Sequence, residues 1–89
     1  MSKHHSHPDI VMRLKRADGH LRGIIDMIEA GRPCLDIAQQ LCAVENAVRE
    51  AKKILIHDHL DHCLDAAATT ATAETRDAIG EFKAITKYL

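Results

Sequence analysis

Three histidines and one cysteine lie within seven residues, between His57 and Cys63. His59 and Cys63 are four residues apart, so on a helix they share one face, with His62 on the flank of that face and His57 roughly opposite. An imidazole and a thiolate at this spacing suit Zn, Cu, Co or Ni. The alternative is a polar helix end with solvated histidines. The density of ligand-type residues favours a metal site.

Cys34 is a second candidate ligand, 25 residues before His59. Within one straight helix that separation is roughly 38 Å, so the two residues cannot share a metal in one chain. If two long helices pair antiparallel about a twofold axis near Val48, Cys34 of one chain meets His59 and Cys63 of the other. Such an isologous dimer would hold two symmetric sites, each of two thiolates and one imidazole. The alternative for Cys34 is a small buried hydrophobic residue. Cys42 has no histidine at helical spacing and is predicted to be a packing residue.

The elements that must position these residues are helices. Pro8 and Asp9 suit a first helical turn, and Gly31-Arg32-Pro33 suits a helix end. Between them, aliphatic residues follow at alternating steps of four and three, which is typical of a heptad stripe; these are Ile10, Leu14, Ala17, Leu21, Ile24 and Ile28.

A second stripe runs from Cys34 through a stretch without Gly or Pro, and the pattern persists to about Asp65. It predicts a helix of roughly 30 residues, about 45 Å long, which one short neighbour cannot bury. Residues 66–73 (AAATTATA) are compatible with a helix end, a linker or a weakly helical continuation. Residues 74–89 form a third amphipathic segment. We therefore predict an all-α fold of three unequal helices, whose long central helix pairs antiparallel across a dimer. The second stripe comprises Cys34, Ile37, Leu41, Val44, Val48, Ala51 and Leu55.

Composition limits the class of protein. A chain of 89 residues forms one small domain, and its aromatic residues are only Phe82 and Tyr88. Partner chains are therefore expected to complete the burial. Three cysteines, with no signal peptide or transmembrane run, indicate a cytoplasmic protein without a membrane partner. The net charge of −1 excludes a histone-like protein, and the absence of a nucleophile–base pair argues against an enzyme.

Basic residues gather in the first part of the chain. Residues 1–53 carry nine basic against seven acidic residues, and residues 54–89 carry three against six. These charges form either a solvated face or, repeated in an oligomer, a positive surface for a phosphate backbone. No helix-turn-helix recognition helix or aromatic stacking platform is evident, so DNA would be bound through phosphates and shape. The candidate DNA-binding residues are Arg13, Lys15, Arg16, Arg22, Lys52 and Lys53.

Four segments carry a resemblance to a known family: RLKRADGHLRG (13–23), RPCLDIAQQL (32–41), AVE (43–45) and HLDHC (59–63). They resemble the CsoR/RcnR family of bacterial metal-sensing repressors, particularly its nickel-resistance regulators, from about Pro8 to Leu89. The resemblance implies a single metal-sensing DNA-binding domain over residues 1–89, with residues 1–7 as a flexible arm. It also implies a homodimer, usually assembled into a homotetramer. Such a protein binds double-stranded operator DNA and releases it when the effector binds, which derepresses an efflux or resistance gene.

The same resemblance maps Cys34, His59 and Cys63 onto the family's ligands, and Arg13 and Arg16 onto its DNA-contacting positions. Three ligands of this type suit Cu(I), whereas a fourth from the N-terminus suits Ni(II) or Co(II). The family's N-terminal histidine aligns near Ser2, and the nearby imidazoles could substitute for it. We expect Ni(II) or Co(II), with Cu(I) as the alternative. The N-terminal candidates are His4, His5 and His7.

Two other functions remain open. A thiol sensor on the same scaffold would read formaldehyde or persulfide through Cys34. Formaldehyde-sensing relatives use an N-terminal proline where this chain has Ser2, and persulfide sensors lack the histidine present here as His59. A metal-storing or structural helical protein with no DNA role is the second alternative.

Overall fold

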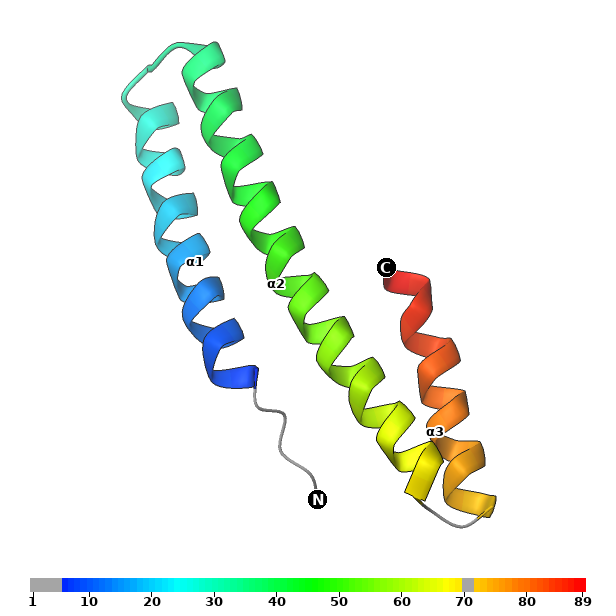
Figure 1. Cartoon of the computed structure of the whole chain (residues 1–89). Coiled ribbons are helices and arrows are strands. Elements are labelled where there is room, and N and C mark those ends of the chain that lie inside the picture. The colour runs from blue at the N-terminus through cyan, green and yellow to red at the C-terminus, as the bar shows by residue number, and fades with distance from the viewer. Residues whose placement is uncertain (1–5, 70–71) are drawn as a thin grey trace. The chain divides into compact units, whose positions relative to one another are not determined.

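The computed structural model describes residues 6–69 and 72–89, in which three α-helices are followed by one short 3₁₀ helix (Figure 1). The helices are α1 (His7–Glu29), α2 (Cys34–Thr69) and α3 (Thr72–Ile85), and the 3₁₀ helix η1 spans Thr86–Tyr88. No strand occurs in the described ranges. The predicted all-α class with three unequal helices is thus confirmed. α2 has 36 residues, longer than predicted, because the alanine-rich continuation is itself helical as far as Thr69.

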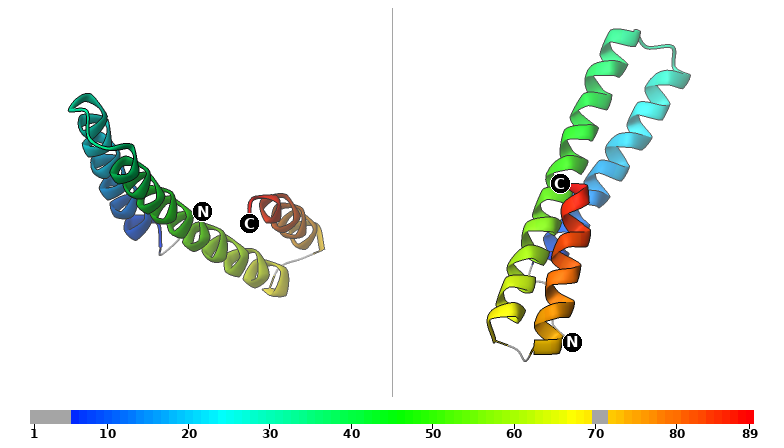
Figure 2. Two further views of the ribbon diagram at one scale, coloured as in Figure 1. Left: turned by 90° about the horizontal axis from the view of Figure 1, so that it is seen from above. Right: turned by 90° about the vertical axis from the view of Figure 1, so that its right-hand side faces the viewer.

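The chain divides into two compact units, one of residues Pro8–Lys52 and the other containing Ser6, His7 and Lys53–Leu89. In the first unit, α1 and the first half of α2 form an antiparallel hairpin (Figures 1 and 2). In the second unit, α3 runs back along the second half of α2 (Figure 2). None of the described helices is both long enough and apolar enough to cross a membrane.

The hairpin buries three of the six predicted stripe residues of α1 and two of the seven predicted for α2. On α1, the buried residues Ile10, Ala17 and Ile24 are seven apart, and on α2 Val44 and Ala51 are also seven apart. Seven residues are close to two helical turns, so each set forms a single line facing the other helix. The alternate members of both stripes remain exposed; these are Leu14, Leu21 and Ile28 on α1, and Leu41 and Val48 on α2.

The turn between α1 and α2 is a Schellman motif built on Gly31. This glycine has a φ of 72°, in the left-handed region. Its N–H donates to the Ile28 carbonyl at 3.1 Å, and the Arg32 N–H donates to the Met27 carbonyl at 3.0 Å. These two bonds satisfy carbonyls that the end of α1 would otherwise leave unpaired. Pro33 then precedes α2, and its carbonyl accepts the Ile37 N–H at 3.2 Å.

The second unit has a small core of its own. Ile56 and Cys63 of α2 and Ala78 of α3 are buried. A cavity of about 340 Å³ lies beside them, lined by Cys63, Leu64, Ala78, Ile79, Phe82 and Lys83. Because Cys63 belongs to this core, its environment depends on how α3 packs against α2.

Replacement of Gly31 tests the turn. Gly31→Ala should lower the free energy of unfolding by about 1–2 kcal/mol, because alanine is strained in the left-handed conformation. Gly23→Ala is the matched control: Gly23 lies inside α1, and a Cβ there meets no atom within 4 Å. It should raise stability by about 0.5–1 kcal/mol. Urea unfolding followed by circular dichroism measures both, and equal effects of the two substitutions would contradict the assignment of the turn.

Candidate metal centre

His59 and Cys63 lie one turn apart on the second half of α2. The Cys63 Sγ is 3.3 Å from the His59 Nε2, so the two candidate ligand atoms are in contact. Cys63 is only 3% exposed, and His59 is partly buried. Both side chains start from a rigid helix, which limits their freedom and orients them toward the same point.

Glu81 of α3 is the third member of this cluster. Its Oε2 lies 3.8 Å from the His59 Nε2 and 3.9 Å from the Cys63 Sγ. One ligand-type atom from each of His59, Cys63 and Glu81 lies within 4.8 Å of the others. Sequence reasoning missed Glu81, because the spacing within one helix does not reveal which residue of α3 faces α2. The available signal was a carboxylate between Ala78 and Phe82, which both line the apolar side of α3.

The surroundings of Cys63 favour the protonated thiol. Burial raises the pKa of Cys63, and the nearby charge of Glu81 raises it further. The thiol also donates a hydrogen bond to the Glu81 carboxylate, which again raises the pKa. A metal that binds the thiolate must therefore displace a proton. The cluster offers sulfur, nitrogen and oxygen donors, a mixture that suits borderline divalent metals.

The other predicted ligands lie outside this cluster. Cys34 is the first residue of α2, belongs to the first unit and is exposed. His7 is the first residue of α1 and is exposed, whereas His4 and His5 lie outside the described residues. The expectation that Cys42 is a packing residue is wrong in this chain, because Cys42 is exposed. Its position beside the apolar stripe turns it away from the face that α1 covers.

The residue before α1 contacts the helix that carries the cluster. The Ser6 hydroxyl donates to the Asp58 Oδ2 at 2.7 Å. Asp58 directly precedes His59, and Ser6 directly precedes His7. Ser6 is therefore held beside the residue that precedes the predicted ligand His59. Of the expected flexible arm, residues 1–7, only Ser6 and His7 are described.

The predicted DNA-binding residues lie at exposed or half-exposed positions. On α1, the Arg13 Nε donates to the Asp9 Oδ2 at 2.8 Å, and this hydrogen bond raises the pKa of Arg13. The Arg22 guanidinium lies 3.2 Å from the Asp18 carboxylate. Both are exposed pairs one turn apart, which contribute little to stability but orient the guanidinium groups. The remaining candidates are exposed: Lys15, Arg16, Lys52 and Lys53.

Comparison with known proteins shows that this chain is similar to transcriptional regulators. Residues 6–87 match a family described as metal-sensitive transcriptional repressors. The copper-sensing transcriptional repressor CsoR of Bacillus subtilis is 36% identical over 102 residues, an alignment that covers 98% of this chain and 99% of that protein. The CsoR of Mycobacterium tuberculosis is 35% identical over 79 residues, covering 83% of this chain. This chain spans 66% of the length of that protein and 47% of the CsoR of Mycobacterium ulcerans.

A solved structure has a similar fold. The nickel-responsive transcriptional regulator InrS superposes with a TM-score of 0.72 at 30% sequence identity. The superposition covers 92% of this chain and 98% of that one. Both a copper-sensing and a nickel-responsive protein are therefore similar to this chain.

Titration of Cys63 tests the electrostatics of the cluster. In protein that carries Cys34→Ser and Cys42→Ser, the ultraviolet absorbance of the thiolate reports Cys63 alone. We expect a pKa above that of an ordinary cysteine, about 8.5. Adding Glu81→Gln should lower the pKa, since it removes the negative charge, but not to the ordinary value, since burial remains. Asp77→Asn, an exposed carboxylate on the same helix, is the control. A pKa that does not respond to Glu81→Gln would contradict the packing of α3 described above.

Proposed function

The chain belongs to the CsoR/RcnR family of metal-sensitive transcriptional repressors, and from that premise we propose that it holds operator DNA in the metal-free state and releases it on binding Ni(II) or Co(II). Release would derepress a metal efflux or resistance gene. The observation that carries the proposal is the contact between the buried Cys63 thiol and the His59 imidazole. The family consists of transcriptional repressors rather than enzymes, in agreement with the sequence prediction.

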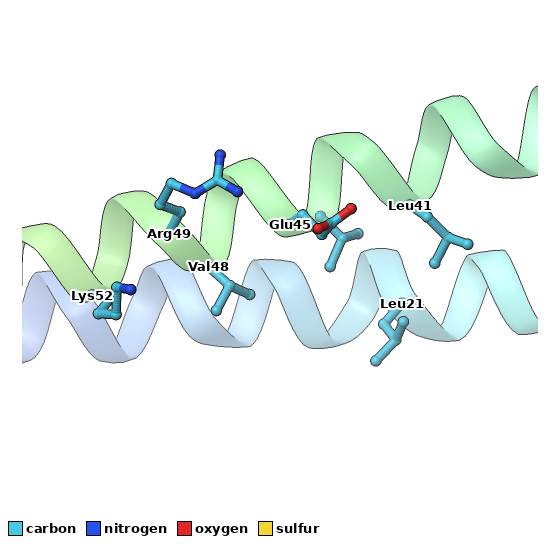
Figure 3. Close-up of a pocket in the computed structure, with 7 residues that line it drawn as sticks. Leu21, Leu41, Glu45, Val48, Arg49 and Lys52 are labelled. Atoms are coloured by element: carbon cyan, nitrogen blue, oxygen red, sulfur yellow. The ribbon is translucent and has the colours of Figure 1, made fainter. Parts of the chain in front are cut away.

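The active form in this proposal is a homodimer, assembled further into a homotetramer. Apolar side chains of both helices line an open cavity of about 430 Å³ in the first unit (Figure 3). Leu21, Leu41 and Val48 point toward the same side of the hairpin, with Leu21 42% exposed and Val48 45% exposed. A second copy of this chain, with its α2 antiparallel about Val48, would cover them. Glu45, Arg49 and Lys52 at the same cavity would then form the polar rim of the interface.

The dimer would also complete the metal site. Cys34 of one subunit would join His59 and Cys63 of the other, giving two sites per dimer related by the twofold axis. Glu81 would lie beside each site, as an oxygen donor or as a hydrogen-bond partner of the ligands. The Ser6–Asp58 hydrogen bond supports an additional N-terminal ligand, because it holds Ser6 against the residue that precedes His59. We propose His7, or else His4 or His5, for that position.

The choice of Ni(II) or Co(II) depends on this additional ligand. Nickel and cobalt prefer four or more ligands of mixed type, which the N-terminal imidazole would help to supply. The alternative is a Cu(I)-responsive repressor that uses Cys34, His59 and Cys63 alone. It is favoured by the copper-sensing relatives, whereas the nickel-responsive InrS structure favours the first choice.

The DNA-binding residues in this proposal are basic residues of α1 and two lysines near the middle of α2. Arg13, Lys15, Arg16 and Arg22 are presented along α1, and Lys52 and Lys53 along α2. Phosphate contacts of this kind give salt-dependent affinity and little sequence information. Operator choice would then depend on DNA shape and on the spacing of the surfaces in the oligomer.

Cys34→Ala is the first test. The variant should bind a duplex selected from a random-sequence pool as tightly as the wild type, because no basic residue is lost. It should fail to release the duplex when Ni(II) or Co(II) is added, because a ligand is missing. Fluorescence anisotropy measures both properties. Cys42→Ala, the other exposed cysteine, should respond to metal normally. A Cys34→Ala protein that still leaves DNA on metal addition would exclude Cys34 as a ligand.

Deletion of residues 2–7 separates the two metals. A Cu(I) sensor should keep its affinity and its response, since it needs only Cys34, His59 and Cys63. A Ni(II) sensor should bind metal more weakly and stay on DNA even when saturated, because the N-terminal ligand is gone. Metal titration and anisotropy with each ion distinguish these outcomes. A truncated protein that responds normally to nickel would contradict the N-terminal ligand.

A further inference from the structure

A small basic cavity lies between α1 and α2 in the first unit. It has a volume of about 170 Å³ and is lined by Arg13, Arg16, Ala17, His20 and Ala47. A water molecule occupies about 30 Å³ in the liquid, so the cavity has room for a tetrahedral oxyanion. Three of its five lining residues carry nitrogen donors, and none is acidic.

The three donor residues form a row along α1. Arg13, Arg16 and His20 are separated by three and then four residues, which places them on one side of the helix. The row extends over roughly 10 Å of helix axis. Phosphates follow one another every 3.4 Å or so along the axis of each DNA strand, so a row of donors fits a strand better than an isolated anion.

His20 is held in place by a residue of the other helix. Its Nε2 lies 2.6 Å from the Gln40 Oε1, a hydrogen bond that joins α1 to α2. Both side chains are at the surface, where water would satisfy them equally well. The bond therefore does little for stability. Its main consequence is a fixed imidazole that leaves Nδ1 as the ring nitrogen available to a ligand.

The two arginines at the cavity differ in their acidic neighbours. Asp9 holds Arg13 through its Nε, so the two Nη groups of Arg13 are not used in that bond. Glu50 of α2 also acts on Arg13 through its charge. Arg16 has no such acidic partner among the described residues. The positive charge at the cavity is therefore carried by the row of residues on α1.

We infer that this cavity receives a phosphodiester group of the DNA backbone. Arg13 and Arg16 supply positive charge, and His20 donates a hydrogen bond from Nδ1. Gln40 is the positioning residue for His20. When Nδ1 donates, Nε2 is also protonated and donates to the Gln40 carbonyl, so His20 binds the phosphate as an imidazolium. This inference rests on the proposed DNA-binding function and adds His20 and Gln40 to it.

The test uses metal-free protein and a labelled mixed-sequence duplex of about 30 base pairs at low salt, since phosphate contacts do not depend on sequence. His20→Ala should weaken binding about ten-fold, the usual effect of losing a hydrogen bond to a charged group. Gln40→Ala should weaken it by about three-fold. The double variant should bind no more weakly than His20→Ala, because Gln40 acts through His20. Gln39→Ala, an exposed neighbour, is the matched control and should bind like the wild type.

Further variants and competitors make the outcomes distinct. His20→Gln keeps an amide donor and should lose less affinity than His20→Ala, and circular dichroism verifies that each variant is helical. Inorganic phosphate at constant ionic strength should compete only weakly, because a single free anion in the cavity replaces one of the several phosphate contacts that a DNA strand makes along the row. Strong competition by phosphate would instead indicate a small-anion site and overturn the inference.

Three other results would also overturn it: wild-type affinity in His20→Ala, equal losses in Gln39→Ala and Gln40→Ala, or additive losses in the double variant. Each of these leaves the proposed repressor function in place. A wild-type protein that binds no duplex at all would reject both the inference and that function.

Discussion

Two helices lying side by side can bury only the line of residues that faces the partner helix. In this chain each helix of the first unit carries two such lines, and Ile24 is 1% exposed while Leu21, three residues earlier, is 42% exposed. Burying a large aliphatic side chain contributes about 1.5–3 kcal/mol, and a whole domain is stable by only about 5–15 kcal/mol. Covering the second line therefore affects the stability of the whole molecule. The proposed dimer follows from this constraint, and with it the proposed metal site that takes Cys34 from the other subunit.

Binding of a metal at the cluster of His59, Cys63 and Glu81, as proposed, would change its charge and its contacts together. Without metal, burial and Glu81 favour a protonated Cys63 thiol that donates to the carboxylate. A metal ion would replace that proton and compete with Glu81 for the same sulfur. The Ser6 hydroxyl donates to Asp58, the residue before His59, and Ser6 directly precedes His7, the first residue of α1. If the proposed function holds, this short connection would link the metal site to the helix that carries Arg13 and Arg16.

Sequence reasoning identified what depends on local spacing. Pro8 near the start of α1, Gly31 at its end and the shared face of His59 and Cys63 all follow from helical geometry and turn chemistry. Features that depend on contacts between helices were not predictable in this way. The heptad spacing did not reveal which residues of each apolar stripe are buried between α1 and α2. Helix spacing also did not place Glu81 beside Cys63. Cys42 was misjudged for the same reason, since its exposure depends on which side of α2 meets α1.

The most direct test of the account is complementation between two defective chains. Cys34→Ala and Cys63→Ala should each lose the complete site when studied alone. If the ligands come from different subunits, mixing the two proteins under conditions that exchange subunits restores one complete site in each mixed dimer. Thiolate-to-metal charge-transfer absorption with Ni(II) should then recover to about a quarter of the wild-type intensity, since about half of the dimers are mixed and each has one of two sites. No recovery in demonstrably exchanged subunits would contradict a metal site shared between two chains.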